Sequence, residues 1–280
     1  MDIDDILASV DRDNFTSPES TALDHQQLTR LWIAERAVSE VLPWPEALMS
    51  RMMERVRTQV ETIEDLTASS YEAASSGHGQ GQKQNHNQNQ TINLKLSILQ
   101  TDLSRTQFLI RSFLRQRIAK LTKYAMHYLL LISPPASSSS QQPSSSSSNN
   151  NSAIRTEDTI PNPTTPATTS TTPLSPEEAK FLYAHQHLLA THYSDSFLAS
   201  FPPQLRRLDD NAGGTSMVQG PDTKEVCFVR VLVDQVTVVV PADETLDEDT
   251  FGTTMRMGEV WVARWEGVKR AWERGEVEVL

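Results

Sequence analysis

The stretch Thr91–Ile132, TINLKLSILQTDLSRTQFLIRSFLRQRIAKLTKYAMHYLLLI, decides the fold of this 280-residue chain. It contains no Pro and no Gly, and its apolar residues recur with the period of an α-helix. At 1.5 Å per residue, a single helix of this length extends for about 60 Å. One wide apolar face of this helix consists of Leu96, Leu99, Leu103, Ile110, Phe113, Leu114, Ile118, Leu121, Tyr124, Ala125 and Tyr128.

A second group of apolar residues lies on the opposite side of the same predicted helix. It consists of Leu94, Ile98, Phe108, Leu109 and Met126. A helix that is apolar on two sides needs more than one neighbour to keep both sides out of water. We therefore expect a bundle shared with other chains, which favours an assembly subunit over an enzyme.

Charge is unevenly distributed along the chain. The whole sequence has a formal net charge of −11, which disfavours a general affinity for nucleic acid. The stretch 91–132, in contrast, holds seven basic residues and one acidic residue, a net charge of +6. Such a helix can neutralise acidic neighbours in its own chain, bind an acidic partner or follow a phosphate backbone. The charge pattern alone leaves these alternatives open.

Arg117 falls inside the main apolar face of the basic helix. Its guanidinium group must either extend to solvent or meet a carboxylate, because an unpaired buried charge is very costly. Glu35, on the apolar stripe of the first predicted helix, is a candidate partner within the chain. The sequence leaves both alternatives open.

Three more helices are predicted around the basic helix. The first starts at Asp24, where Gln27 completes a capping box, and ends before Pro43-Trp44-Pro45. The second follows these prolines and carries an apolar stripe to Leu66. The last starts at Ser175-Pro176-Glu177-Glu178, a strong helix start, and runs to about Phe201.

The pattern changes to short β-branched runs after Gly213-Gly214. We predict strands at Val226–Val233 and Val236–Val240, joined as a tight hairpin by Asp234-Gln235, and further strands at Glu259–Ala263 and Val277–Leu280. Trp265–Arg274 reads as a short helix that Gly275 ends. The predicted fold class is α+β, with an N-terminal four-helix bundle-like domain and a small C-terminal β-rich domain.

Composition divides the chain further. We expect a flexible N-terminal partner-binding peptide at 1–20, a helical domain at 21–201, a linker at 202–216 and the β-rich domain at 217–280. Within the helical domain, 73–90 and 133–173 are dominated by Ser, Thr, Asn, Gln, Gly and Pro. Such tracts cannot bury enough apolar surface to offset the entropy of ordering, so we predict disordered insertions.

Motifs for catalysis or metal binding are missing from the sequence. There is no nucleophile elbow and no phosphate-binding glycine loop. His185 and His192 lie two helical turns apart with no third ligand in place, and Cys227 alternates with valines as a core residue does. We expect no enzyme, no cofactor and no metal. The longest apolar run, Val226–Val240, is interrupted by Arg230 and Asp234, so no membrane span is expected.

Three segments resemble the GINS family of eukaryotic replication-factor subunits, and most closely its Sld-type member. They are RSFLRQRIAKLTKYAMHYL (Arg111–Leu129), LSPEEAKFLYAHQHLLATHYSDSFL (Leu174–Leu198) and MGEVWVARWEGVKRAWERGEVEVL (Met257–Leu280). The order of a helical domain followed by a β-rich domain also fits. The resemblance implies a non-catalytic nuclear scaffold that forms a heterotetramer with three sister GINS subunits.

The resemblance also implies further partners. The tetramer would join the minichromosome-maintenance ATPase ring and its RecJ-like companion activator in the replicative helicase, which initiates and elongates replication, so that any contact with DNA is indirect. In similar Sld-type subunits, an acidic N-terminal D-D-I-L-x-x-L pattern binds a trimeric replisome hub. The matching residues here are Asp4, Asp5, Ile6, Leu7 and Val10, with Val10 in place of Leu.

Within the basic helix, six residues are expected at the subunit interface: Arg111, Arg115, Arg117, Lys120, Lys123 and Tyr124. The alternative function is direct nucleic-acid binding through the helix at 91–132. Bases of a single strand usually stack on aromatic side chains. Phe113, Tyr124 and Tyr128 are poorly placed for stacking, because they lie on the apolar stripe.

Overall fold

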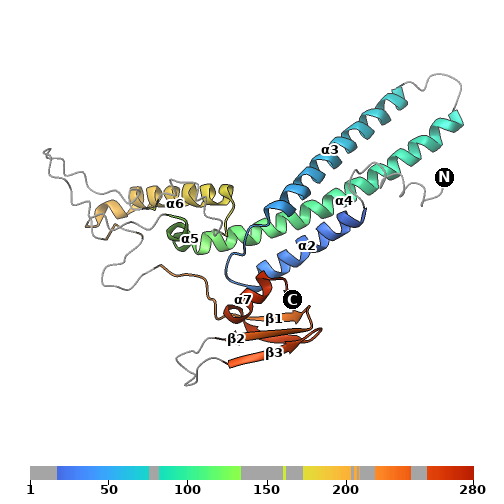
Figure 1. Ribbon diagram of the computed structural model, residues 1–280. Coiled ribbons are helices and arrows are strands. Elements are labelled where there is room, and N and C mark those ends of the chain that lie inside the picture. Colours follow the sequence, from blue (N-terminus) through green and yellow to red (C-terminus); the bar gives the residue numbers. More distant parts are fainter. Residues whose placement is uncertain are drawn as a thin grey trace.

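The computed structural model describes residues 18–75, 82–133, 160–161, 173–202, 205, 206, 208, 218–240 and 251–280 (Figure 1). Its helices are α2 (Pro18–Ala37), α3 (Glu46–Ser75), α4 (Gln82–Lys123), α5 (Ala125–Ile132), α6 (Pro176–Ser196) and α7 (Trp265–Glu273), with a 3-10 turn at Leu198–Ser200. Its strands are β1 (Val226–Val231), β2 (Gln235–Val240), β3 (Phe251–Arg256), β4 (Val260–Arg264) and β5 (Val277–Val279). The predicted α+β class, helical part first, is confirmed.

Helix α4 is the axis of the helical domain. Helices α2 and α3 pack along it, and α3 and α4 project together beyond α2 as a two-helix arm (Figure 1). Side chains from these three helices form one core cluster: Leu28, Leu48, Met49, Met52, Ile110 and Phe113. The helices of the domain do not form one compact bundle, because α6 packs with α5 at the other end of α4.

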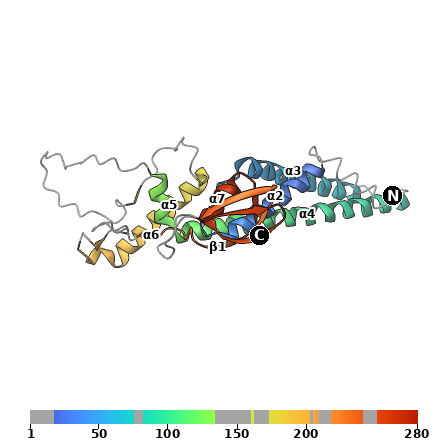
Figure 2. The ribbon, with the colours of Figure 1, turned by 60° about the horizontal axis from the view of Figure 1, so that its bottom comes forward.

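The prediction of one uninterrupted helix over 91–132 is wrong at Tyr124. The backbone there turns to φ −112° and ψ 33°, which separates α4 from α5. Helix α5 leaves the axis of α4 on the side of α6 (Figure 2). The turn lets Tyr128, Leu129 and Ile132 enter a second core cluster with Leu182 and Ala190 of α6.

The predicted helix starts have different outcomes. Helix α2 starts at Pro18, a residue suited to the first turn, so the predicted start at Asp24 is wrong. Asp24 instead lies inside α2 and its carboxylate pairs with Arg51 of α3 at 2.7 Å. The start of α6 is confirmed: the Glu178 amide donates to the Ser175 hydroxyl, and the Ser175 amide donates to the Glu178 carboxylate.

Helix covers both ends of the stretch 73–90, for which we predicted disorder, since α3 continues to Ser75 and α4 starts at Gln82. Within 133–173, Ile160 is described and lies buried in the second core cluster. The proposed partner-binding residues Asp4, Asp5, Ile6, Leu7 and Val10 lie outside the described residues.

The β domain contains two small antiparallel sheets. Strand β1 lies between β4 and β5, and β2 pairs with β3. The predicted hairpin of the first two strands is therefore wrong, and β3 was not predicted. Strands β4 and β5 and the short helix α7 are found where we expected them. Cys227, Val229 and Val231 of β1 point into the core, as the alternation predicts.

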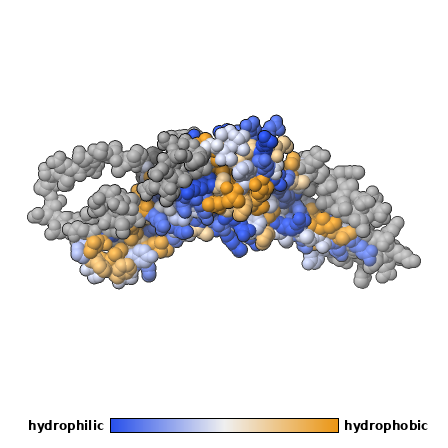
Figure 3. Space-filling model, turned by 90° about the horizontal axis from the view of Figure 1, so that it is seen from below, coloured by the Kyte–Doolittle hydropathy of each residue, from blue (hydrophilic) through white to orange (hydrophobic). Residues whose placement is uncertain are grey.

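The β domain packs against the helical domain and not apart from it. Its core cluster includes Ala34 and Val38 from the α2 region and Leu42 from the loop that follows, together with Trp265 and Val268 of α7. Exposed apolar side chains remain on the sheet of β1 and β4, and hydrophobic patches are visible from below, where the β domain lies (Figure 3). None of the helices in the described ranges has the length and apolar composition of a membrane span.

Gly275 ends α7 as the sequence predicts. Its φ of +74° is in the left-handed region, and two hydrogen bonds close the helix end, from the Gly275 amide to the Trp272 carbonyl and from the Glu276 amide to the Ala271 carbonyl. This is the Schellman arrangement, which favours glycine because a Cβ atom is strained at positive φ.

We expect Gly275→Ala to lower the free energy of unfolding by about 1–2 kcal/mol, the cost of a left-handed conformation for a residue with a Cβ atom. Gly252→Ala in β3 is the matched control, because its added Cβ would meet only ordinary contacts at 3.9 Å. Denaturant unfolding of the two variants measures the difference. Equal losses of stability would contradict this account of the helix end.

Candidate subunit interface and the buried ion-pair network

Arg117 lies at the point where the parts of the helical domain meet. Its side chain is 0% exposed. Its guanidinium group donates from Nη1 to Glu35 of α2 at 3.2 Å and from Nε and Nη2 to Glu178 of α6 at 2.7 and 2.9 Å. Of the two alternatives that the sequence left open, the pairing with Glu35 is confirmed and extension of Arg117 to solvent is wrong.

Backbone carbonyls complete the coordination of Arg117. Nη1 also donates to the Leu42 carbonyl at 2.7 Å, and Nη2 donates to the Pro173 carbonyl at 3.1 Å. The five N–H groups of the guanidinium are thereby all used. Its Cζ also lies 5.2 and 5.5 Å from the ring centroids of Trp44 and Phe113, within the range of cation–π contacts.

Lys120 is the second cation of the network. One helical turn beyond Arg117, its Nζ contacts the other oxygen of Glu35 at 2.8 Å and the Glu40 carbonyl at 2.7 Å. Two cations, Arg117 and Lys120, thus face two carboxylates, Glu35 and Glu178. This balance of charge is what makes burial of such groups tolerable.

The two cations respond differently to burial. Burial lowers the pKa of Arg117, but hydrogen bonds and charges from Glu178 and Glu35 outweigh this effect and raise it overall. For Lys120, burial dominates and lowers the pKa, although Glu35 opposes it. Arg117 also lowers the pKa of Lys120, because the two like charges are close.

Glu40 connects this network to the β domain. Its backbone carbonyl accepts from Lys120, while its carboxylate accepts from Trp265 Nε1 at 2.9 Å and pairs with Lys269 at 2.7 Å. Nearby, the Val41 amide donates to the buried Tyr128 hydroxyl at 2.8 Å. Burial raises the pKa of Tyr128 to about 12, so the hydroxyl stays neutral at physiological pH.

A second polar cluster joins α2, α3 and α4 towards the arm. His25 lies 2.8 Å from the Thr106 hydroxyl, and Gln59 donates to Asp102 at 2.6 Å. Arg55 also contacts Asp102, at 3.5 Å. Asp102, the one acidic residue of the basic stretch, is therefore engaged with α3.

The six predicted interface residues separate into two groups. Arg117, Lys120 and Tyr124 are buried by their own chain, so their side chains offer no surface to another subunit. Arg111, Arg115 and Lys123 are exposed and stay candidates for subunit contact. The sequence did not predict the contact between Glu178 and Arg117. Glu178 was noted only as part of the capping box of α6, and 61 residues separate it from Arg117.

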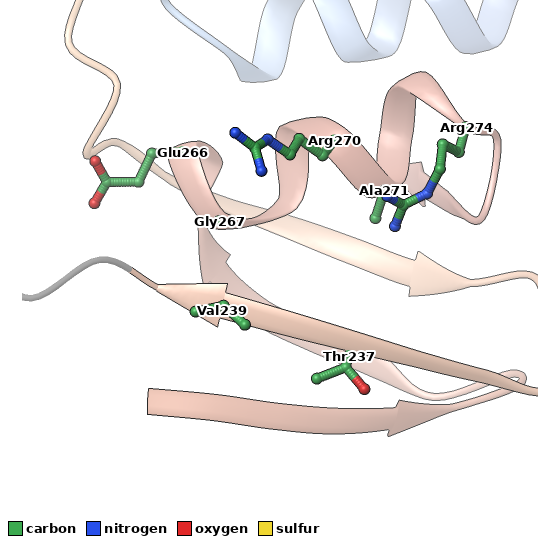
Figure 4. A pocket seen from close by; sticks show the side chains of 7 residues that line it. All are labelled: Thr237, Val239, Glu266, Gly267, Arg270, Ala271 and Arg274. Carbon is green, nitrogen blue, oxygen red and sulfur yellow. The ribbon is translucent and has the colours of Figure 1, made fainter. Parts of the chain in front are cut away.

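A polar cavity of about 400 Å³ lies in the β domain, away from this network. It opens between α7 and β2, where the small residues Gly267 and Ala271 leave space above Thr237 and Val239 (Figure 4). Arg274 at its edge is paired with Glu276 at 2.7 Å. Within the described residues, no group of three or more His, Cys, Asp or Glu side chains is arranged to hold a metal ion.

Two family models match the chain in the order of its domains. The model described as "GINS complex protein helical bundle domain" matches residues 59–197, and the one described as "DNA replication complex GINS protein SLD5 C-terminus" matches 221–280. The protein named "DNA replication complex GINS protein SLD5" from Chaetomium globosum is 31% identical over 282 residues, covering 100% of both chains.

The chain belongs to the SLD5 family of GINS proteins. Proteins of the same name from Debaryomyces hansenii and Yarrowia lipolytica are 27% and 26% identical, and the matches cover 98% and 84% of their lengths. The resemblance drawn from the three sequence segments is thus confirmed at the level of the family. The protein is a DNA replication GINS subunit.

Replacement of Arg117 tests the network. We expect Arg117→Met to lower the free energy of unfolding by about 3–5 kcal/mol, because it leaves Glu35 and Glu178 without their main partner in a buried setting. Arg117→Lys should restore only part of this loss, since an ammonium group cannot form the forked contacts.

The matched control is Arg115→Met, the same substitution two residues away at an exposed position. It should change the free energy of unfolding by no more than about 0.5 kcal/mol. Denaturant titration of the chain at low concentration, where self-association is weakest, followed by circular dichroism, provides the comparison. A small effect at Arg117, similar to that at Arg115, would show that the network contributes little to stability.

Proposed function

We propose that the chain is a non-catalytic scaffold subunit that assembles with three sister GINS subunits. The observation that carries the proposal is the match over the whole chain to relatives named as GINS proteins, with both domains in the same order. The buried ion pairs of Arg117 and Lys120 in the described structure also support it, since they join helices to one another and do not line a cavity.

The arm of α3 and α4 supports an assembly role. It extends beyond α2 with only two helices (Figure 1). Two helices cannot enclose each other's apolar side chains, and Tyr71 and Leu94 are exposed along the arm. Partner subunits would cover these side chains in the assembled complex.

The proposal also includes partners outside the GINS complex. The tetramer is proposed to act in the nucleus, to join the minichromosome-maintenance ATPase ring and its RecJ-like companion activator, and to contact the trimeric replisome hub through Asp4, Asp5, Ile6, Leu7 and Val10. Support comes from the family membership and from the acidic and apolar pattern of these residues. An acidic segment with apolar anchors is suited to binding as a short helix in a partner's groove.

Direct nucleic-acid binding is the alternative. Exposed Arg105, Arg111, Arg115 and Lys123 on α4 favour it, because phosphates bind such side chains. Phe113, Tyr124 and Tyr128 do not, because they are buried and unable to stack on bases. The two functions differ in what the exposed face of α4 should bind.

Co-expression tests the scaffold role. Produced alone, the chain should aggregate or elute as a broad species, and with its three sister subunits it should form a monodisperse complex with one copy of each. Light scattering coupled to gel filtration measures both. A stable, monodisperse monomer would count against an obligate subunit.

The N-terminal contact has its own test. Replacing Ile6 and Leu7 with Ala should abolish binding of the assembled tetramer to the trimeric hub, while Ser9→Ala should leave it unchanged. Val10→Leu should tighten binding, because it restores the residue of the family pattern. Calorimetric titration gives the affinities. If the Ile6 and Leu7 variant binds normally, the hub contact lies elsewhere.

A further inference from the structure

The exposed side of α4 carries a regular strip of residues. The strip consists of Leu94, Ser97, Thr101, Ser104, Phe108, Arg111, Arg115, Ile118 and Thr122, all exposed. They follow one another at alternating steps of three and four, which is the spacing of positions that contact a second helix. We call these nine residues the outer strip of α4. At 1.5 Å per residue it runs for about 42 Å.

The outer strip lies opposite the buried side of α4. Leu99, Thr106, Ile110, Phe113 and Arg117 are buried against the other helices of the chain, and at 100° per residue they fall on the far side of the helix from the strip. Ile118, which we predicted on the main apolar face, is 42% exposed and belongs to the edge that remains open.

Large apolar residues recur along the strip. Leu94 is 40% and Phe108 61% exposed. Phe108 is held in place from one side, because its ring meets Trp32 of α2 edge-on with centroids 6.3 Å apart. Apolar side chains repeated on one face at helical spacing mark a surface that a partner covers.

The charge on this face has one sign. Arg111 and Arg115 lie on the strip, and Arg105 and Lys123 flank it. Arg111 donates to Gln107, Lys123 lies over the Tyr124 ring, and none of these four cations forms an ion pair with another described residue. Arg36 of α2 is a further cation near this face, because it lies over Trp32, 5.3 Å from the ring centroid, and Trp32 contacts Phe108.

We propose that the outer strip of α4 is the docking site for an acidic amphipathic helix of a sister GINS subunit. Apolar residues of that helix cover Phe108 and Ile118, and its carboxylates face Arg111 and Arg115. This inference rests on the proposed function and specifies which face meets a sister subunit and what chemistry that subunit presents. Charge complementarity of this kind sets both the partner and the register.

A nucleic acid fits the strip less well than a helix. Phosphates would bind the arginines, but they make no use of Leu94 and Ile118, whose aliphatic side chains cannot stack on bases. The alternating spacing of three and four residues along the strip matches the side chains of a second helix, and a phosphate backbone carries no such side chains. The aliphatic positions therefore distinguish the two occupants.

Charge reversal in the complete complex tests the proposal. We expect the variant carrying Arg111→Glu and Arg115→Glu to bind the three co-expressed sister subunits at least tenfold more weakly. Arg111→Lys with Arg115→Lys should stay within threefold of the unchanged chain, because the charges are kept. Lys180→Glu, at an exposed position on α6, is the control and should have no effect.

The Ile118→Ser variant distinguishes a protein helix from a nucleic acid as the molecule that binds the outer strip. It should weaken subunit binding at least tenfold and leave the affinity of the assembled complex for single-stranded and duplex DNA unchanged. Circular dichroism of every variant should match the unchanged chain, because the substituted side chains are exposed. A photo-crosslinking residue at position 118 should react with one sister subunit, at a segment with acidic residues at helical spacing.

The outcomes are distinguishable. If the unchanged chain forms the tetramer and the charge-reversed and Ile118→Ser variants form it equally well, the inference fails and the proposed function stands. If charge reversal weakens only DNA binding, the strip is a nucleic-acid surface and the inference is wrong. If the unchanged chain forms no tetramer, the proposed function and the inference both fail.

Discussion

The ion pairs of Arg117 are the constraint on which the rest of the structure depends. A guanidinium group with no exposed surface requires partners for its charge and for every N–H group, because removal from water is otherwise far too costly. Those partners come from α2, from the loop after it and from the start of α6. One side chain of α4 thereby fixes the positions of three distant segments.

The consequences extend to the second domain. Lys120 shares Glu35 with Arg117 and also holds the Glu40 carbonyl, while the Glu40 side chain binds Trp265 and Lys269 of α7. The apolar core formed by Val38, Leu42 and Val268 lies beside these contacts. The β domain is therefore seated on the helical domain by hydrogen bonds and apolar packing together.

The helical period of α4 places its buried side chains on one side and its exposed side chains on the other. One side carries Leu99, Ile110, Phe113 and Arg117 into the chain, and the other presents two arginines together with a few large apolar residues. A scaffold subunit needs both kinds of surface. Burial on the inner side makes the helix rigid, and a rigid helix can present side chains at fixed spacing to a partner.

Much was determined by the sequence alone. Local signals predicted the capping box at Ser175, the glycine end of α7 and the inward alternation of Cys227 and Val229, because each depends on near neighbours or on the period of a strand. The family resemblance likewise needed only short segments.

Other features were decided only by tertiary structure. The break at Tyr124, the separation of β1 from β2, and the burial of Lys120 depend on which segments pack together. The contact between Glu178 and Arg117 likewise joins residues that are 61 positions apart in the sequence. Long-range packing and desolvation determine these features, and neither leaves a periodic trace in the sequence.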